Sequence, residues 1–199
     1  GGVGDLVIGS TVGAQPSNTT LGASSNIQFS VTTINGALGS APVTVNVGES
    51  AKTVAAKINA KTNLTGVSAT ARTEIDLTAL SAGASYSLAV VSDNTPPATV
   101  VFTVGMGANN ADSLAAGIQA FNDKSSTTGV TAKLNTAGNG ITLTNASGGD
   151  ILLTNNAALA GTSVPVGGVA VAGAGGSGYV VGSLALDSDK TNGLSSTPA

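Results

Sequence analysis

The sequence predicts an α+β fold that is predominantly β, with two tandem strand–strand–helix–strand units that each have short antiparallel strands and one helix. Apolar and polar residues alternate along most of the chain, and this period of two is typical of half-buried strands. In two places the apolar residues change to helical spacing, and similar segments follow: KINAKTNLTGVSATAR from Lys57 and AFNDKSSTTGVTAKL from Ala120. The repetition indicates that one small structural unit occurs twice.

The first unit is expected to begin with two strands. Apolar residues occupy alternate positions in both, first at Ile27, Phe29 and Val31 and then at Val43, Val45 and Val47. The segment ESAKTVAAKINAKT then predicts a helix with Ser50 as N-cap and Lys61 in its last turn, where the helix dipole favours a cation. Its apolar face consists of Ala51, Val54, Ala55 and Ile58. A third strand follows Gly66, with Val67, Ala69 and Ala71 on one face.

The second unit repeats this order with larger apolar residues. Its first two strands have alternating apolar residues at Tyr86, Leu88 and Val90 and at Val100, Phe102 and Val104. The segment NNADSLAAGIQAFNDK predicts a helix capped by Asn110 or Asp112, with an apolar face formed by Leu114, Ile118 and Phe121. The next strand contains Val130, Ala132 and Leu134. An Asn139-Gly140 hairpin turn is then expected to lead into a strand with Ile141 and Leu143.

The composition predicts a thin core and excludes most catalytic chemistry. Of 199 residues, 41% are hydrophobic, but only 3% are aromatic and 9% are charged. The chain has no Cys, His or Trp, so disulfides, thiolate or imidazole catalysis, and zinc sites with Cys or His ligands are impossible. The sequence therefore predicts a protein that is not an enzyme and binds neither a cofactor nor a transition metal.

The charge pattern argues against nucleic acid and membrane partners. The net charge is −3, and the seven Lys and Arg residues form no basic stripe. The apolar stretch VPVGGVAVAGAGGSGYVVGSLAL, from Val164, is long enough to span a bilayer, but its Gly, Ser and Pro residues favour two strands around a glycine loop. The chain starts with GGVGD, without Met or a signal peptide, as expected of an excised fragment.

Two loop-like motifs have simpler interpretations than a binding site. GAGGSG, with Gly173, Gly175 and Gly178, has the spacing of a dinucleotide phosphate loop, but a strand-like segment follows where that loop requires a helix. DSDKTNG places Asp187 and Asp189 as in a calcium loop, but its glycine comes one position late and no Glu closes the coordination shell. A surface loop and a polar turn are expected, and weak calcium binding by Asp187 and Asp189 is left open.

Glu74 and Asp76 form a carboxylate pair two residues apart on one strand face. A glycosidase pair normally needs aromatic platforms and a deep cleft, and this chain has only two tyrosines. We interpret Glu74 and Asp76 as solvated strand charges with Arg72 nearby.

The repeated segment joins the end of each helix to the following strand. An apolar residue precedes an Asn, and Thr-Gly-Val begins six residues after that Asn. These positions are Ile58, Asn59, Thr65, Gly66 and Val67 in the first copy and Phe121, Asn122, Thr128, Gly129 and Val130 in the second. Together with GDLVIG near the start and GITLTNASGGDILL after the second copy, this pattern resembles the IN motif of bacterial flagellins and some hook-associated filament proteins.

The resemblance implies a structural outer domain from the variable central region of flagellin. Such a domain is extracellular, lies on the surface of the flagellar filament, supports motility and forms the variable antigenic surface. The long terminal helices that build the filament shaft in this family are absent from the sequence, so the contacts with other flagellin subunits are expected to lie in segments absent here. The fragment itself is expected to be monomeric.

Three regions follow from this interpretation: a first unit with an N-terminal strand (1–80), a second unit (81–160), and a Gly-rich return segment whose strand pairs back toward the N-terminus (161–199). Antibodies or host receptors are further expected partners, and Ser and Thr side chains are candidate O-glycan acceptors. NTT, NLT and NAS match the N-glycan sequon. The alternative function is an extracellular adhesin, or a hook-associated or cap protein domain, that binds glycans or host surfaces.

Overall fold

The computed structural model describes residues 17–25, 27–157 and 162–188. In chain order, its elements are β1 (Asn18–Leu21), β2 (Thr33–Gly36), β3 (Gly39–Pro42), α2 (Ala51–Asn59), α3 (Thr62–Thr65), β4 (Val67–Thr78), β5 (Ser85–Val91), β6 (Ala98–Thr103), α4 (Ala111–Asp123), α5 (Ser125–Thr128), β7 (Val130–Leu134), β8 (Gly140–Asn145), β9 (Ile151–Asn155), β10 (Val164–Val166), β11 (Val169–Val171), β12 (Gly176–Val181) and β13 (Ser183–Ser188). The predicted class, predominantly β with added helices and antiparallel strands, is confirmed.

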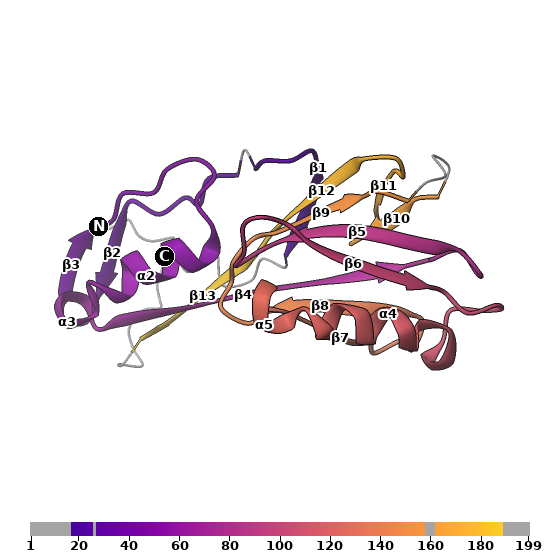
Figure 1. Cartoon of the computed structure of the whole chain (residues 1–199). Coiled ribbons are helices and arrows are strands. Elements are labelled where there is room, and N and C mark those ends of the chain that lie inside the picture. Colours follow the sequence, from indigo (N-terminus) through magenta and orange to yellow (C-terminus); the bar gives the residue numbers. More distant parts are fainter. Residues whose placement is uncertain (1–16, 26, 158–161, 189–199) are drawn as a thin grey trace.

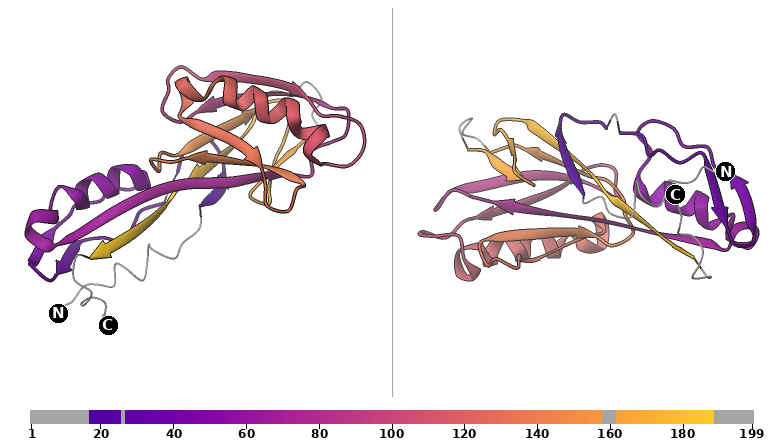
Figure 2. Two further views of the ribbon diagram at one scale, coloured as in Figure 1. Left: turned by 90° about the horizontal axis from the view of Figure 1, so that it is seen from below. Right: turned by 180° about the vertical axis from the view of Figure 1, so that it is seen from behind.

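The strands form two larger sheets and one separate hairpin. The first sheet has the order β1-β12-β9-β5-β6, and the second has the order β11-β10-β4-β8-β7 with β13 also paired to β4. β2 and β3 pair only with each other. Figure 1 shows the hairpin with α2 and α3 at one end of an elongated molecule and the larger sheets with α4 at the other. Both views in Figure 2 show β4 and β13 extending from the larger part into the smaller part.

Each part has its own hydrophobic core. The larger core lies between the two sheets and against α4, and it contains the tilted aromatic rings of Tyr86, Phe102 and Phe121. The smaller core is formed by α2, the hairpin, the first half of β4, and β13, and its buried residues are Val31, Ile34, Val43, Val45, Val54, Ala55, Ile58, Val67, Ala69 and Leu184. Ser50 caps α2, and Asn110, rather than Asp112, caps α4.

β4 belongs to both cores, because its pairing partner changes along its length. Residues 67–72 pair with β13, whereas residues 73–78 pair with β8. Val67 and Ala69 accordingly lie in the smaller core, and Ile75 and Leu77 lie in the larger core. The second copy of the repeated segment and everything up to β12 are therefore inserted between two strands, β4 and β13, that pair with each other.

Three local predictions were wrong. The strands expected around residues 27–31 and 43–47 are extended segments outside the hairpin ladder, which runs from Thr33 to Pro42. Scattered bonds join these segments, such as the one from the N–H of Val43 to the carbonyl of Thr32. Val31, Val43 and Val45 are buried in the same core as the apolar face of α2, whereas Val47 is exposed, so the alternation indicated partial burial without a continuous ladder.

The other two errors concern helix and turn ends. α2 ends at Asn59, so the basic residue in its last turn is Lys57, and Lys61 lies beyond the helix. Gly140 begins β8 instead of completing a two-residue turn with Asn139. The loop is organised by Asn135, whose Oδ1 accepts hydrogen bonds from the N–H groups of Asn139 and Gly140. The segment GDLVIG lies outside the described residues.

A glycine turn fixes the two parts together where β4 changes partner. Gly148 has φ +85°, and a Cβ atom there would overlap the side chain of Ala71 and lie 2.9 Å from its carbonyl carbon. The carbonyl of Gly148 accepts a hydrogen bond from the N–H of Lys52 at the start of α2 (3.1 Å), and the hydroxyl of buried Thr73 donates to the carbonyl of Gly149 (2.7 Å). We call this contact region the waist.

We expect Gly148→Ala to destabilise the protein by more than Gly168→Ala. Both glycines have φ +85°, but no atom lies within 4 Å of the Cβ position at Gly168. The control should therefore lose only the backbone cost, about 1–2 kcal/mol, while Gly148→Ala should lose a further ~1–3 kcal/mol through overpacking. Urea unfolding of both variants measures the difference, and equal losses would contradict the close packing at the waist.

Candidate functional site

The repeated asparagines connect the end of each long helix to the strand that follows. The side-chain amide of Asn59 donates from Nδ2 to the carbonyl of Ala69 (2.8 Å) and accepts at Oδ1 from the N–H of the same residue (2.7 Å). Asn122 makes the same pair with Ala132, at 2.9 and 2.7 Å. In both cases the partner lies ten residues further along the chain. Each asparagine thus imitates one residue of a neighbouring antiparallel strand.

The apolar residue before each asparagine anchors the helix. Ile58 is fully buried in the smaller core, and Phe121 is buried in the larger core beside Phe102. The neighbouring asparagines are on the exposed side. Each Ile-Asn or Phe-Asn pair therefore combines apolar packing with a polar link to the backbone of the next strand.

The Thr-Gly-Val segment reverses the chain into this strand. The hydroxyl of Thr65 donates to the carbonyl of Lys61 (3.2 Å) and accepts from the N–H of Val67 (3.0 Å). Gly66 has φ +78°, the left-handed conformation that glycine adopts without a steric penalty. Its N–H donates to the carbonyl of Thr62 (2.7 Å).

The second copy has the same turn. Thr128 donates to the carbonyl of Lys124 (3.1 Å) and accepts from the N–H of Val130 (3.0 Å), and Gly129 has φ +75°. The hydroxyls of both threonines satisfy backbone groups inside the protein, since Thr65 and Thr128 are buried. Signals in the sequence identified this turn, but not the hydrogen bonds that form it.

A hairpin tip closes each turn from the side. The N–H of Leu38, between β2 and β3, donates to the carbonyl of Thr65 (3.2 Å). The N–H of Asp93, between β5 and β6, donates to the carbonyl of Thr128 (2.9 Å). Leu38 and Asp93 are thus equivalent in position but not in chemistry. No sequence similarity between the two hairpins indicated this equivalence.

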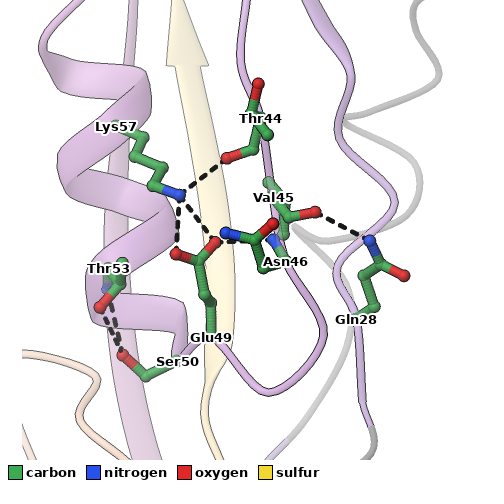
Figure 3. A network of polar contacts seen from close by, with 8 residues as sticks. All are labelled: Gln28, Thr44, Val45, Asn46, Glu49, Ser50, Thr53 and Lys57. Carbon is green, nitrogen blue, oxygen red and sulfur yellow. Dashed lines mark hydrogen bonds and ion pairs between the residues drawn. The ribbon is translucent and has the colours of Figure 1, made fainter.

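A polar network fixes the start of α2, as Figure 3 shows. Lys57 Nζ donates to both carboxylate oxygens of Glu49 (2.8 and 2.7 Å) and to the carbonyl of Thr44 (2.7 Å). The N–H of Asn46 also donates to Glu49 (2.8 Å). These bonds, led by that of Lys57, lower the pKa of Glu49. Ser50 accepts from the N–H of Thr53 (3.1 Å), so the network and the N-cap together hold the chain before the helix.

The remaining candidates from the sequence do not come together in one site. Glu74 pairs with Arg72 (3.4 Å), while Asp76 accepts a hydrogen bond from the hydroxyl of Thr142 (2.6 Å). Asp187 lies on β13, and Asp189 lies outside the described residues. GAGGSG leads into strand β12 rather than a helix.

Three general features bear on function. Within the described ranges, no group of three or more Asp and Glu side chains could hold a metal ion. None of the helices in that part of the chain is long and apolar enough to cross a membrane. Of the three N-glycan sequons, the asparagine of NAS, Asn145, is 1% exposed, whereas Asn18 and Asn63 are exposed.

A cavity at the waist was missed by the sequence analysis. It has a volume of about 550 Å³ and is lined by Ala23, Ser50, Lys52, Val91, Ser92, Asp93, Gly149, Asp150, Leu152 and Tyr179. These residues come from five separate segments of the chain and form no motif. Only their arrangement in the fold brings them together.

Asp150 and Tyr179 are coupled at this cavity. The Tyr179 hydroxyl donates to Asp150 Oδ2 (2.8 Å), while Oδ1 of Asp150 is buried without a hydrogen-bond partner. Burial raises the pKa of Asp150, and the hydrogen bond from Tyr179 opposes this shift. Burial, followed by the hydrogen bond and the charge of Asp150, raises the pKa of Tyr179 well above its usual range. Tyr179 therefore remains a hydrogen-bond donor at neutral pH.

Residues 33–94 match the family model of the flagellin hook IN motif. The match includes the first hairpin, α2, the repeated segment with Asn59, and β4. The second copy, from Ala120, lies outside the matched range. A comparison with curated proteins found no match. The resemblance is thus confirmed for the first copy of the repeated segment: the chain contains a flagellin IN motif, which supports a flagellin-like structural protein.

We expect Asn59→Ala and Asn122→Ala to reduce the free energy of unfolding by about 1–2 kcal/mol each. Each variant loses two hydrogen bonds of ~1 kcal/mol, and water partly replaces them because both side chains are exposed. The double variant should show additive losses, because the two sites belong to different cores. Urea unfolding measures all three, with Asn63→Ala at an exposed position of α3 as the control. A loss from the control as large as from Asn59→Ala would contradict a specific role for the repeated asparagines.

We expect Asp150→Asn to change how stability depends on pH. Since the pKa of Asp150 is raised in the folded state, the native protein binds more protons than the unfolded chain between the ordinary and the raised pKa. Wild-type stability must therefore fall as pH rises through this window. The amide of the variant cannot titrate, so the stability of the variant relative to the wild type should increase from about pH 4 toward neutrality. Urea unfolding at several pH values measures the difference, and parallel profiles would refute it.

Proposed function

We propose that this chain is a surface-exposed outer domain of a flagellin-type filament protein, with a structural and non-enzymatic role. The main support is the repeated Asn–backbone joint, which has the same bonds at Asn59 and Asn122 within 0.1 Å. The side-chain hydrogen bonds of Asn59, Asn122, Thr65 and Thr128 all go to the protein's own backbone. The motif residues thus fix a shape and leave no motif side chain directed to a ligand.

In this proposal, two strand–strand–helix–strand units occupy residues 1–80 and 81–160, and residues 161–199 form a return segment. The element orders β2-β3-α2-α3-β4 and β5-β6-α4-α5-β7 support two related units. The pairing of β12 with β1 and of β13 with β4 supports the return segment. The units share one sheet through the pairing of β4 with β8. We therefore expect them to move together rather than as two independent domains.

The proposed role places the domain outside the cell, on the flagellum, where its loops form the variable antigenic surface. Contacts that build the filament belong, in this proposal, to segments beyond this chain, and the isolated chain is monomeric. Pro42 supports this, because the hairpin register puts it at a non-hydrogen-bonded position of β3, where its missing N–H weakens the outer edge for pairing with another strand. Exposed Ser and Thr side chains are the proposed O-glycan acceptors.

Thiol labelling of intact filaments tests the outer position directly, because the chain has no cysteine of its own. Asn63→Cys, on exposed α3, should react with a membrane-impermeant maleimide dye when introduced into the filament protein that contains this chain. Ala55→Cys is the control, since Ala55 is 7% exposed in the smaller core and should not react until the protein is denatured. Normal filaments that remain unlabelled at position 63 would refute an outer position.

A further inference from the structure

The waist cavity has the size and chemistry of a small-ligand site. Its volume of about 550 Å³ lies within the usual range of ligand pockets, roughly 300–1,000 Å³. Val91 and Leu152 supply apolar walls, and polar groups come from the start of α2, the β5–β6 tip, the β8–β9 connection and β12. Gly149 also lines the cavity, and a Cβ atom there would lie 3.0 Å from Asn145 Nδ2 and 3.2 Å from Asp93 Oδ1.

One carboxylate is held in place with an oxygen free of hydrogen bonds. Asp93 Oδ1 accepts from Nδ2 of Asn145 (3.0 Å), and this buried amide also donates to the hydroxyl of Ser92 (2.7 Å). The backbone N–H of Asp93 is fixed by Thr128, as described above. Within the described part of the chain, Asp93 Oδ2 has no hydrogen bond or ion pair, and it lies against Gly129, where a Cβ atom would overlap it. Asp150 adds a second, half-buried negative charge, whose Oδ2 is occupied by Tyr179.

A positive charge lines the same cavity. Lys52 is in the first turn of α2, where the helix dipole is positive and no acidic residue is present. Its side chain is exposed, and it forms neither of the ion pairs found among the described residues. Lys52 and Asp93 therefore line one cavity without neutralising each other.

The repeated turn places the Asp93 side chain against Gly129, as it places Leu38 against Gly66, but it does not explain why residue 93 is a carboxylate. In the first unit the equivalent hairpin-tip position is Leu38, which makes the same backbone bond to the turn. A carboxylate is thus not needed to close the turn. What distinguishes the second unit is that its tip faces Lys52, Asp150 and Tyr179 across the waist.

We propose that the waist cavity binds a small zwitterion of amino-acid size, with its ammonium group on Asp93 and its carboxylate on Lys52. Asp150 strengthens the ammonium site through its charge, and both contacts are charge-assisted hydrogen bonds. A neutral ligand would leave both protein charges unpaired, and a simple cation would be repelled by Lys52. This binding function is additional to the proposed structural role.

Calorimetric titration at low salt tests this proposal with L-serine as the zwitterion and with acetate and ethanolamine as its two halves. We expect saturable, one-site binding of L-serine with a Kd of about 1 mM or tighter, and at least about tenfold weaker binding of each half, because each meets only one of the two charges. Absence of saturable binding up to about 50 mM, or equal binding of ethanolamine alone, would overturn the proposal.

Charge-removing variants locate the site. Lys52→Met and Asp93→Asn should each weaken L-serine binding at least about tenfold, which is a change of ~1.4 kcal/mol. Lys124→Met and Asp123→Asn remove similar exposed charges at the end of α4, away from the cavity, and should leave binding unchanged. Circular dichroism checks folding, and Lys52→Met decides the matter alone if Asp93→Asn unfolds. Binding that persists in Lys52→Met would overturn the proposal and leave the labelling result for the filament role unaffected.

Discussion

The structure depends on a pair of hydrogen bonds in which the side-chain amide of an asparagine pairs with a strand residue as a backbone peptide group would. At the end of each long helix, an asparagine donates to and accepts from a single backbone residue of the strand that returns beside it. Only an unbranched amide of this length offers a donor and an acceptor with the spacing of a peptide group. The joint sets both the distance and the direction between helix and strand, and the packing of Ile58 and Phe121 follows from it.

Such joints matter because the cores are thin. The chain has only five aromatic residues, two Tyr and three Phe, and much of its apolar content is small. Compensation comes from close backbone approach: at Gly148 and Gly182 a Cβ atom would collide with β4 at Ala71 and Thr73. β4 then passes through both cores and receives β13 and β8 in turn. Because one strand belongs to both cores, strand pairing rather than a linker sets the orientation of the two parts.

Local signals in the sequence were sufficient for the features that depend on neighbouring residues. The N-cap at Ser50, the buried face with Val54 and Ile58, and the class of the fold were all predictable, because caps and helical faces depend on spacing within one turn or two. The pairing of Ser183 with Arg72 joins residues 111 positions apart, and no local period encodes it. The sequence identified the repeated segment, but it did not identify Ala69 as the hydrogen-bond partner of Asn59. The hydropathy pattern does not depend on the hydrogen bonds of an exposed asparagine. The cavity could not be predicted either, because its lining residues come from five separate segments of the chain.

The chain has few charged residues, so each ionic group can be considered separately. Among the described residues, the ion pairs are Lys57–Glu49 and Arg72–Glu74, and both are at least partly exposed, so salt screens them and their contribution to stability is small. Amides and hydroxyls make most of the specific polar contacts, and these groups do not titrate near neutral pH. The stability of such a fold should therefore depend little on salt concentration. Although the chain has few charged side chains, Lys52, Asp93 and Asp150 line the same cavity. There they can form ionic contacts with another molecule.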